Sequence, residues 1–190
     1  FVNSDRIMLQ HFMIRLANQF YLIIILVFAL FSLEIRASTI KQYDEVISLG
    51  TACQAAWQLE GNGMRRLAYP FDWLVTPFHG LIPFIINQGA GFLDKDKIEI
   101  VKTLPGKATF LHVADLTYDI HFIHDFHGTE IIDNYDKIKN KYDRRIQRFF
   151  TLLQSNKKIL FFRVQITRDE AIVLDNLIHT TYPNLEYTLV

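Results

Sequence analysis

Apolar and polar positions follow two rhythms along residues 41–190, which indicates a mixture of strands and helices. Residues 44–50 are a short β-rich run that ends in glycine. Residues 53–60 then carry apolar side chains at helical spacing until two glycines stop them. This pattern predicts a strand, a tight turn and a helix. Residues 64–80 contain two prolines and show no lasting period, so we expect a structured loop.

The middle of the chain has shorter patterns. Residues 81–88 predict a short helix, and residues 108–123 hold two β-rich stretches separated by Asp115 and Leu116. We expect these stretches to form a hairpin or two adjacent strands. Residues 124–130 are then expected to form a loop.

The last third of the chain has the clearest periodicity. Residues 135–154 predict a helix, because one face repeats apolar side chains: Ile138, Tyr142, Ile146, Phe149, Phe150 and Leu153. Residues 157–164 predict a strand covered on both sides, residues 168–181 a helix and residues 185–190 another strand. Strand, helix and strand form a βαβ unit with parallel strands. The predicted fold class is therefore α/β, a layered sandwich with a mostly parallel sheet flanked by helices.

An apolar run near the beginning has a different character. Residues 20–33 hold fourteen residues that are nearly all apolar, preceded by Arg6 and Arg15. A membrane-spanning helix needs about 20 apolar residues, so a signal peptide fits better, with an uncleaved anchor or a buried helix as alternatives. We expect residues 1–40 to be a targeting segment and the protein to be secreted or in the cell envelope.

Residues 41–190 are expected to form a single α/β catalytic-like domain. The sequence stops inside an apolar strand, so we expect this domain to be truncated at its C-terminus.

Composition narrows the class of protein. Half of the residues are hydrophobic and 21% are charged, which excludes an intrinsically disordered chain. Twenty basic residues balance twenty acidic ones, so we expect no nucleic-acid partner, and membrane contact through residues 20–33 only. The single cysteine excludes a disulfide framework and a cysteine-rich metal site. The oligomeric state is left open.

That cysteine, Cys53, is the main candidate for chemistry. It follows the sequence SLGTA and falls in the first turn of the predicted helix, where free N–H groups and the helix dipole favour an anion. The same N–H groups could stabilise an oxyanion formed by attack of a thiolate. The alternative is that Cys53 fills a small space in the core among neighbouring alanines.

A nucleophilic cysteine needs a base. His11 lies in the targeting segment and His179 on a peripheral helix, which leaves five histidines: His79, His112, His121, His124 and His127. We favour His124, because it begins the triplet His-Asp-Phe at the end of a β-rich run, where a strand tip can aim an imidazole into a cleft.

The spacing H-x-x-H-x-x-H of His121, His124 and His127 also suggests a metal site. Side chains three residues apart in a strand point to opposite faces, so the three converge only if the segment turns or coils. Solvent-facing histidines are the alternative, and we predict neither a metal nor another cofactor.

Several carboxylates could orient the imidazole: Asp72, Asp115, Asp119 and Asp125. Asp72 lies between Phe71 and Trp73, where an ionised carboxylate needs a partner, and His124, Arg65 and Arg66 are candidates. Alternatively, Asp72 braces its own loop through backbone N–H groups.

Six basic residues share the predicted helix at 135–154: Lys137, Lys139, Lys141, Arg144, Arg145 and Arg148. This face either meets a phosphate or an acidic partner or is a solvated face with i,i+4 ion pairs.

Together, the SLG turn before Cys53, the block PFDW, the triplet HDF, and YDRRIQRFF followed by ILFFR resemble a bacterial family of unknown function described as papain-like cysteine peptidases. The resemblance covers residues 44–190 and implies that Cys53 is the nucleophile and His124 the base, with Asp72 and Asp125 as the acids of the matching blocks. It also offers an α+β papain-like fold as the alternative. Papain-type enzymes carry a glutamine before the cysteine, whereas Gln54 follows it here.

Three functions are consistent with these features. The leading one is a cysteine-dependent hydrolase or acyltransferase that uses a Cys–His pair on an amide, ester or thioester, with a peptide or small acyl substrate. The alternative is a non-catalytic glycan- or peptide-recognition domain in which PFDW forms an aromatic platform and the cysteine is structural. A third is a transferase with a phosphorylated donor, although no glycine-rich phosphate loop supports it.

Overall fold

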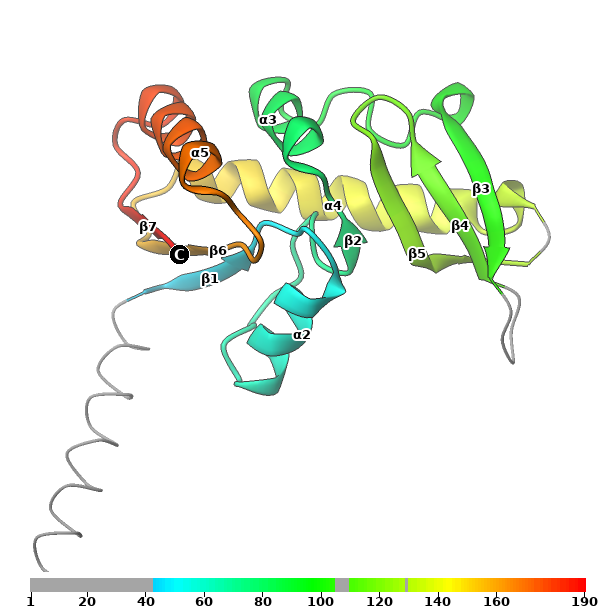
Figure 1. Cartoon of the computed structure of the whole chain (residues 1–190), viewed down its shortest axis with the longest axis horizontal. Helices are drawn as coiled ribbons and strands as arrows, with labels where there is room; N and C mark the ends of the chain where they lie inside the picture. Colours follow the sequence, from blue (N-terminus) through cyan, green and yellow to red (C-terminus); the bar gives the residue numbers. More distant parts are fainter. Residues whose placement is uncertain (1–42, 105–109, 129) are drawn as a thin grey trace, which may run out of the picture. The chain divides into compact units, whose positions relative to one another are not determined.

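The computed structural model describes residues 43–104, 110–128 and 130–190, and these residues build two separate β-sheets (Figure 1). The first sheet has three parallel strands, in the spatial order β1 (Glu45–Ser48), β6 (Ile159–Phe162) and β7 (Tyr187–Leu189). The second has four antiparallel strands, in the order β2 (Leu74–Val75), β5 (Ile120–His127), β4 (Phe110–Asp115) and β3 (Ile98–Leu104).

Within the described residues, four α-helices connect and cover these sheets: α2 (Cys53–Gly61), α3 (Phe78–Ile86), α4 (Tyr135–Leu153) and α5 (Arg168–Thr181). Two short 3-10 helices, η1 (Lys95–Lys97) and η2 (Ile131–Asp133), precede β3 and α4. The predicted helices at 53–60, 135–154 and 168–181 are confirmed to within one residue at each end. At α5 the hydroxyl of Thr167 accepts a hydrogen bond from the N–H of Glu170, and the Glu170 carboxylate accepts one from the N–H of Thr167, which fixes the first residue of the helix.

The sheet prediction needs correction. A mixed architecture of helices and sheets is confirmed, and so is the parallel βαβ unit of β6, α5 and β7, but the expectation of a mostly parallel sheet is wrong. β3, β4 and β5 follow one another through connections of only four or five residues. Such short connections allow antiparallel pairing, whereas parallel neighbours need a long crossover. The larger sheet is therefore antiparallel.

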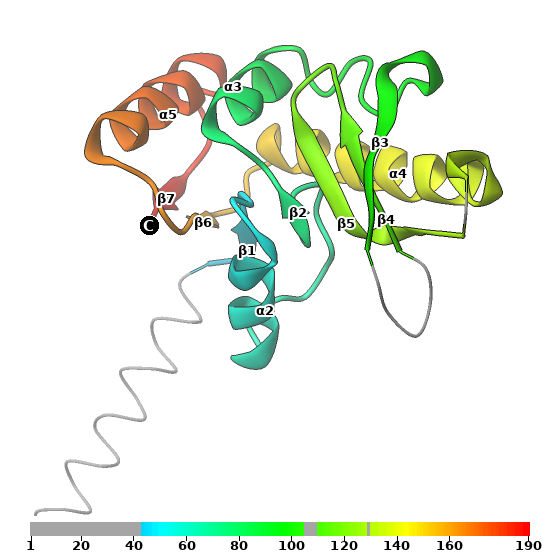
Figure 2. The same ribbon diagram turned by 45° about the vertical axis from the view of Figure 1, so that its right-hand side comes forward.

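The long helix α4 packs against both sheets, and it runs past both in two views (Figures 1 and 2). Near its middle, the ring of Tyr142 lies 5.1 Å from that of Phe122 on β5, centroid to centroid. Near its end, the ring of Phe149 lies 6.5 Å from that of Phe161 on β6. Edge-to-face aromatic contacts of this kind stabilise a core beyond the area they bury. One aromatic core therefore joins the two sheets.

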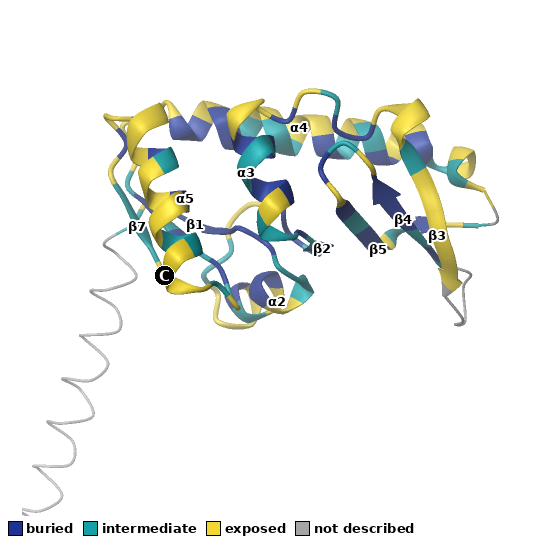
Figure 3. Ribbon diagram, turned by 45° about the horizontal axis from the view of Figure 1, so that its top comes forward, coloured by how far each residue is buried: buried dark blue, intermediate teal, exposed yellow. Residues whose placement is uncertain are grey.

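Three local expectations differ from the structure. β3 was not predicted, because it is an edge strand whose residues are mostly exposed and carry no clean alternation (Figure 3). β2 lies in the segment expected to be a loop. β5 continues to His127 where a loop was expected, because pairing with β4 resumes at Leu111 and Phe126 after a shift in register.

The predicted targeting segment at residues 1–40 lies outside the described residues. In the part of the chain that the structure describes, no helix has the length and apolar character needed to cross a membrane.

Candidate active site

Two consecutive residues with positive φ lie just before Cys53. Gly50 has φ 78°, and a Cβ at this position would lie 2.7 Å from the hydroxyl oxygen of Thr76, so only glycine fits. Thr51 has φ 87°, a conformation that a β-branched residue avoids. Holding such a residue there costs roughly 1 to 3 kcal/mol and requires support from the surrounding structure.

That support comes from hydrogen bonds to distant parts of the chain. The Thr51 hydroxyl donates to the main-chain oxygen of Val164 at 2.8 Å, just after β6. The N–H of Thr76 donates to the main-chain oxygen of Thr51 at 3.4 Å. The turn is therefore held by a residue that follows β6 and by one that follows β2.

Arg163 adds two more hydrogen bonds to this support. Its Nη1 donates to the main-chain oxygen of Leu49 at 2.5 Å, and its Nη2 donates to that of Thr76 at 2.9 Å. The side chain is buried, its guanidinium lies 5.9 Å from the centre of the Phe78 ring, and burial lowers its pKa. Among the described residues it has no carboxylate within ion-pair distance, so backbone carbonyl dipoles hold the positive charge. Arg163 thus ties the segment before Cys53 to the segment that enters α3.

Cys53 is the first residue of α2. Ala52 precedes it in an extended conformation and offers no side-chain cap, so the first N–H groups of α2 have no side-chain acceptor at the N-cap. The core-facing positions of this helix are taken by Ala55, Ala56 and Leu59, whereas Cys53 is partly exposed. The thiol of Cys53 is therefore not sealed in the core.

His124 lies on β5 and its side chain is exposed. It lines a small cavity with the first turns of α4, and Cys53 does not line that cavity. Within residues 43–104, 110–128 and 130–190, no hydrogen bond joins the His124 ring to the Cys53 thiol or to a carboxylate. The structure thus leaves the ring free but does not bring the two proposed partners into contact.

Asp125, the next residue, has other partners. Its carboxylate pairs with the ammonium group of Lys141 and accepts a hydrogen bond of 2.7 Å from the hydroxyl of Tyr142. Burial, followed by the charge of Asp125, raises the pKa of Tyr142 well above its ordinary value, so this hydroxyl remains a donor. Asp125 therefore connects β5 to α4.

Asp72 braces its own loop. It is 1% exposed and accepts hydrogen bonds from Arg65 Nε at 2.8 Å and from the N–H of Tyr69 at 3.0 Å. Burial raises the pKa of its carboxyl group, while the bonds from Arg65 and Tyr69 act in the opposite direction. Of the three partners considered for Asp72, the structure shows Arg65.

The other histidines form a separate group. His79 Nε2 and His121 Nε2 lie 2.8 Å and 3.1 Å from the two carboxylate oxygens of Asp119, and His121 Nδ1 lies 3.0 Å from His112 Nε2. Burial, together with His121 and Lys102, lowers the pKa of His112. His121, His124 and His127 all lie on β5, and the described residues contain no cluster of three or more ligands that could hold a metal ion.

The PFDW block contributes to the core. The ring of Phe71 is fully buried and lies 4.9 Å from that of Phe84 and 5.6 Å from that of Phe149. Trp73 is partly exposed, and Arg65 covers its ring at 5.8 Å. An aromatic platform built from this block would therefore consist of Trp73 alone.

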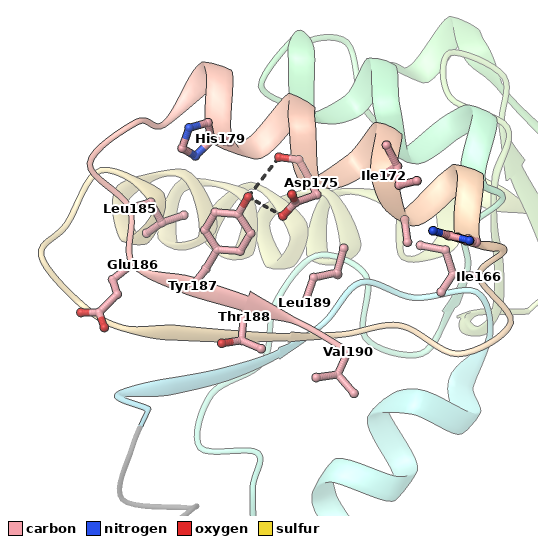
Figure 4. Close-up of a pocket in the computed structure, with 12 residues that line it drawn as sticks. Ile166, Ile172, Asp175, His179, Leu185, Glu186, Tyr187, Thr188, Leu189 and Val190 are labelled. Atoms are coloured by element: carbon pink, nitrogen blue, oxygen red, sulfur yellow. Dashed lines mark hydrogen bonds between the residues drawn. The ribbon is translucent and has the colours of Figure 1, made fainter.

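A groove with a volume of about 750 Å³ lies between α5 and β7, away from these residues (Figure 4). Tyr187 projects across it toward α5 and donates a hydrogen bond of 2.7 Å to the Asp175 carboxylate. Neither Cys53 nor His124 lines this groove.

Two supporting residues were not assigned a role from the sequence. Arg163 ends an apolar strand, and a charged residue at such a position is a signal that it will need buried acceptors. Thr51 falls in the tight turn that the sequence predicts before residue 53. Its positive φ has no counterpart in the sequence pattern, because threonine gives no indication of this conformation.

The fold and site define a protein of the α/β class with a strained turn that presents a lone cysteine at the start of a helix. The chain belongs to the family described as "Putative papain-like cysteine peptidase (DUF1796)", whose model matches residues 44–188. It is also 31% identical over 133 residues to "Uncharacterized protein R408" of Acanthamoeba polyphaga mimivirus, a match that covers 62% of this chain and 60% of the relative. The chain thus spans about three fifths of that curated relative. No solved structure matches it.

Proposed function

We propose that this protein is a cysteine-dependent hydrolase or acyltransferase that acts on an amide, ester or thioester, with Cys53 as nucleophile and His124 as base. The observation that carries the proposal is the strained turn at Gly50 and Thr51, which Arg163 supports from the end of β6. Strain that the surrounding structure must hold in place is concentrated at functional sites. Here it sets the position of a single, partly exposed thiol.

The proposed reaction has two steps. His124 takes the proton of the Cys53 thiol, the resulting thiolate attacks the carbonyl carbon of the substrate, and the electron pair of the C=O bond moves onto its oxygen. The N–H groups in the first turn of α2, which no side chain caps, donate to this oxyanion. As the intermediate collapses, the leaving group takes a proton from His124 and an acyl group remains on the sulfur.

Water or another acceptor then releases the acyl group. His124 removes a proton from the acceptor as it attacks the thioester, and the sulfur leaves as thiolate. This role requires the exposed ring of His124 to approach Cys53 when substrate is bound. Catalytic hydrogen bonds are often loose or unformed in a free enzyme and tighten in the substrate complex.

The experiment uses the fact that Cys53 is the single cysteine of the chain. The full chain is incubated with a panel of nitrophenyl esters, acyl thioesters and fluorogenic peptides, beside Cys53→Ala. We expect turnover of at least one class, an acyl adduct on the Cys53 peptide by mass spectrometry, and no adduct in Cys53→Ala. Equal turnover by the wild type and Cys53→Ala would overturn the proposal.

The base is tested with a matched pair of variants. His124→Ala and His127→Ala each remove an exposed imidazole from β5, three residues apart. We expect His124→Ala to lower kcat/KM by about 100-fold or more, the range for a general base, and His127→Ala to change it little. Equal effects would exclude His124 as the base.

A further inference from the structure

A small cavity of about 280 Å³ lies between the end of β5 and the first turns of α4. Both views place this end of β5 beside α4 (Figures 1 and 2). Three basic side chains of α4 line the cavity, together with two histidines and one carboxylate of β5: Lys137, Lys141, Arg144, His124, His127 and Asp125. The nucleophile Cys53 does not line it, so any binding here is separable from the proposed hydrolysis.

The positive charge in the cavity is only partly compensated. Asp125 pairs with Lys141, while neither Lys137 nor Arg144 has a carboxylate within ion-pair distance among the residues the structure describes. Among the lysine, arginine and aspartate side chains of the cavity, three cations face one carboxylate, which leaves two positive charges. A concave site with an excess of one sign of charge concentrates ligands of the opposite sign.

The remaining basic residues of α4 have other contacts. Lys139 pairs with Asp143 at 2.5 Å, Arg145 lies 5.2 Å from the centre of the Tyr142 ring, and Arg148 donates to the main-chain oxygen of Ala68 at 2.6 Å. These three side chains are therefore engaged by groups outside the cavity.

The start of α4 also favours an anion. α4 is 19 residues long and begins at the cavity, and Asn134 at its N-cap makes no side-chain hydrogen bond to the first turn. The free N–H groups and the dipole of a helix attract negative charge at its N-terminus.

We propose that this cavity binds the phosphoryl group of a small phosphorylated ligand. A phosphomonoester carries about −1.5 to −2 charges at pH 7, which matches the two uncompensated cations, and its oxygens accept hydrogen bonds from lysine, arginine and imidazole donors. A carboxylate would neutralise only one of the two charges.

The test measures binding of inorganic phosphate and of O-phosphoserine to the full chain by isothermal titration calorimetry, at low ionic strength held constant. We expect phosphate to bind at one saturable site. Titration with acetate should release no comparable heat of binding. The double variant Lys137→Gln/Arg144→Gln should weaken phosphate binding by about tenfold or more, because each lost charge-assisted bond carries a large penalty. Tighter binding of O-phosphoserine than of phosphate would identify a phosphomonoester as the ligand, and equal affinity a free phosphate.

Lys139→Gln is the matched control, because it removes the same charge from the same helix outside the cavity. We expect its phosphate affinity to remain within about twofold of the wild type. Equal losses in the control and the double variant, or no saturable binding in the wild type, would overturn the proposal. Circular dichroism checks that both variants are folded.

Cys53→Ser separates this proposal from the proposed function. We expect it to bind phosphate as the wild type does while losing acyl transfer. Phosphate binding without any turnover would contradict the hydrolase alone, and turnover without phosphate binding would contradict the phosphoryl site alone.

Discussion

The guanidinium of Arg163 donates a hydrogen bond of 2.5 Å to the main-chain oxygen of Leu49, across 114 residues of sequence. Arg163, which follows β6 in the parallel sheet, thus fixes Leu49, the residue just before the turn that leads to Cys53. Because the same side chain reaches Thr76, it links β1, β2 and β6 at a single point. The position of Cys53 therefore depends on this link as well as on the helix that it begins.

Replacing Arg163 should destabilise the protein and disturb the site. Arg163→Met leaves the oxygens of Leu49 and Thr76 without their donor, and we expect the free energy of unfolding to fall by about 2 to 4 kcal/mol, since each buried unsatisfied group costs about 1 to 3 kcal/mol. Arg163→Lys can restore one of the two hydrogen bonds. Its free energy of unfolding should therefore lie between those of the wild type and Arg163→Met. Urea unfolding measures both, and a loss below about 0.5 kcal/mol for Arg163→Met, the range of neutral surface changes, would be inconsistent with this role.

Arg65 should be needed for the ionised form of Asp72. Arg65→Met leaves the buried carboxylate without its cation, and we expect a loss of about 3 to 5 kcal/mol at pH 7, as for other broken buried pairs. Without Arg65 the pKa of Asp72, already raised by burial, rises further, so the folded state takes up a proton as pH falls. The stability lost in Arg65→Met should therefore become smaller as the pH falls toward 4.

Arg66→Met is the control for this prediction, because Arg66 is exposed and, in the described residues, donates its hydrogen bond to the main-chain oxygen of Asp44 and pairs with no carboxylate. We expect it to change stability by less than about 0.5 kcal/mol. If Arg65→Met lowers the free energy of unfolding by the same amount at pH 7 and at pH 4, the ion pair is not the cause of the loss.

Asp115 should make stability depend on pH in the direction opposite to that of a salt-bridged carboxylate. It is fully buried and accepts bonds from the N–H groups of Leu93 and Tyr118 at 2.7 Å and 2.9 Å, yet burial raises its pKa from 3.8 to about 6. A raised folded pKa means that the folded state binds more protons than the unfolded state between these values. The contribution of Asp115 to the free energy of unfolding is therefore present below pH 3.8 and is lost as pH rises through about 6.

Asp115→Asn removes this titration. Between pH 7 and pH 4 we expect the free energy of unfolding of the wild type to rise relative to that of the variant by roughly 1 to 3 kcal/mol. Chemical unfolding at several pH values measures the difference. If the free energies of unfolding of the wild type and Asp115→Asn change in parallel with pH, Asp115 is not the titrating group.

The elements with strong local signals were predictable from the sequence. The bounds of α5 follow from the capping pair of Thr167 and Glu170, and α4 follows from its apolar stripe. The parallel βαβ unit follows from the order of β6, α5 and β7, because such a crossover brings the two strands side by side in the same direction.

The second sheet and the support of the site were not predictable in this way. β3 is an exposed edge strand without alternation, and β2 is only two residues long, so both depend on pairing with partners far along the chain. Cys53, His124, Asp72 and Asp125 could be named as candidates from their residue types and motifs. The partners of the two acids, and the role of Arg163, depend on tertiary contacts that no local pattern encodes.

The most direct test of the central claim is the alkylation of Cys53 in the native protein. The thiol is the only one in the chain, so intact mass after iodoacetamide treatment at pH 7 reports on it alone. If the turn and α2 present a reactive thiolate, native Cys53 should react at least about tenfold faster than N-acetylcysteine, and Arg163→Met should slow it. A native protein that resists alkylation and reacts only after unfolding in urea would contradict this account.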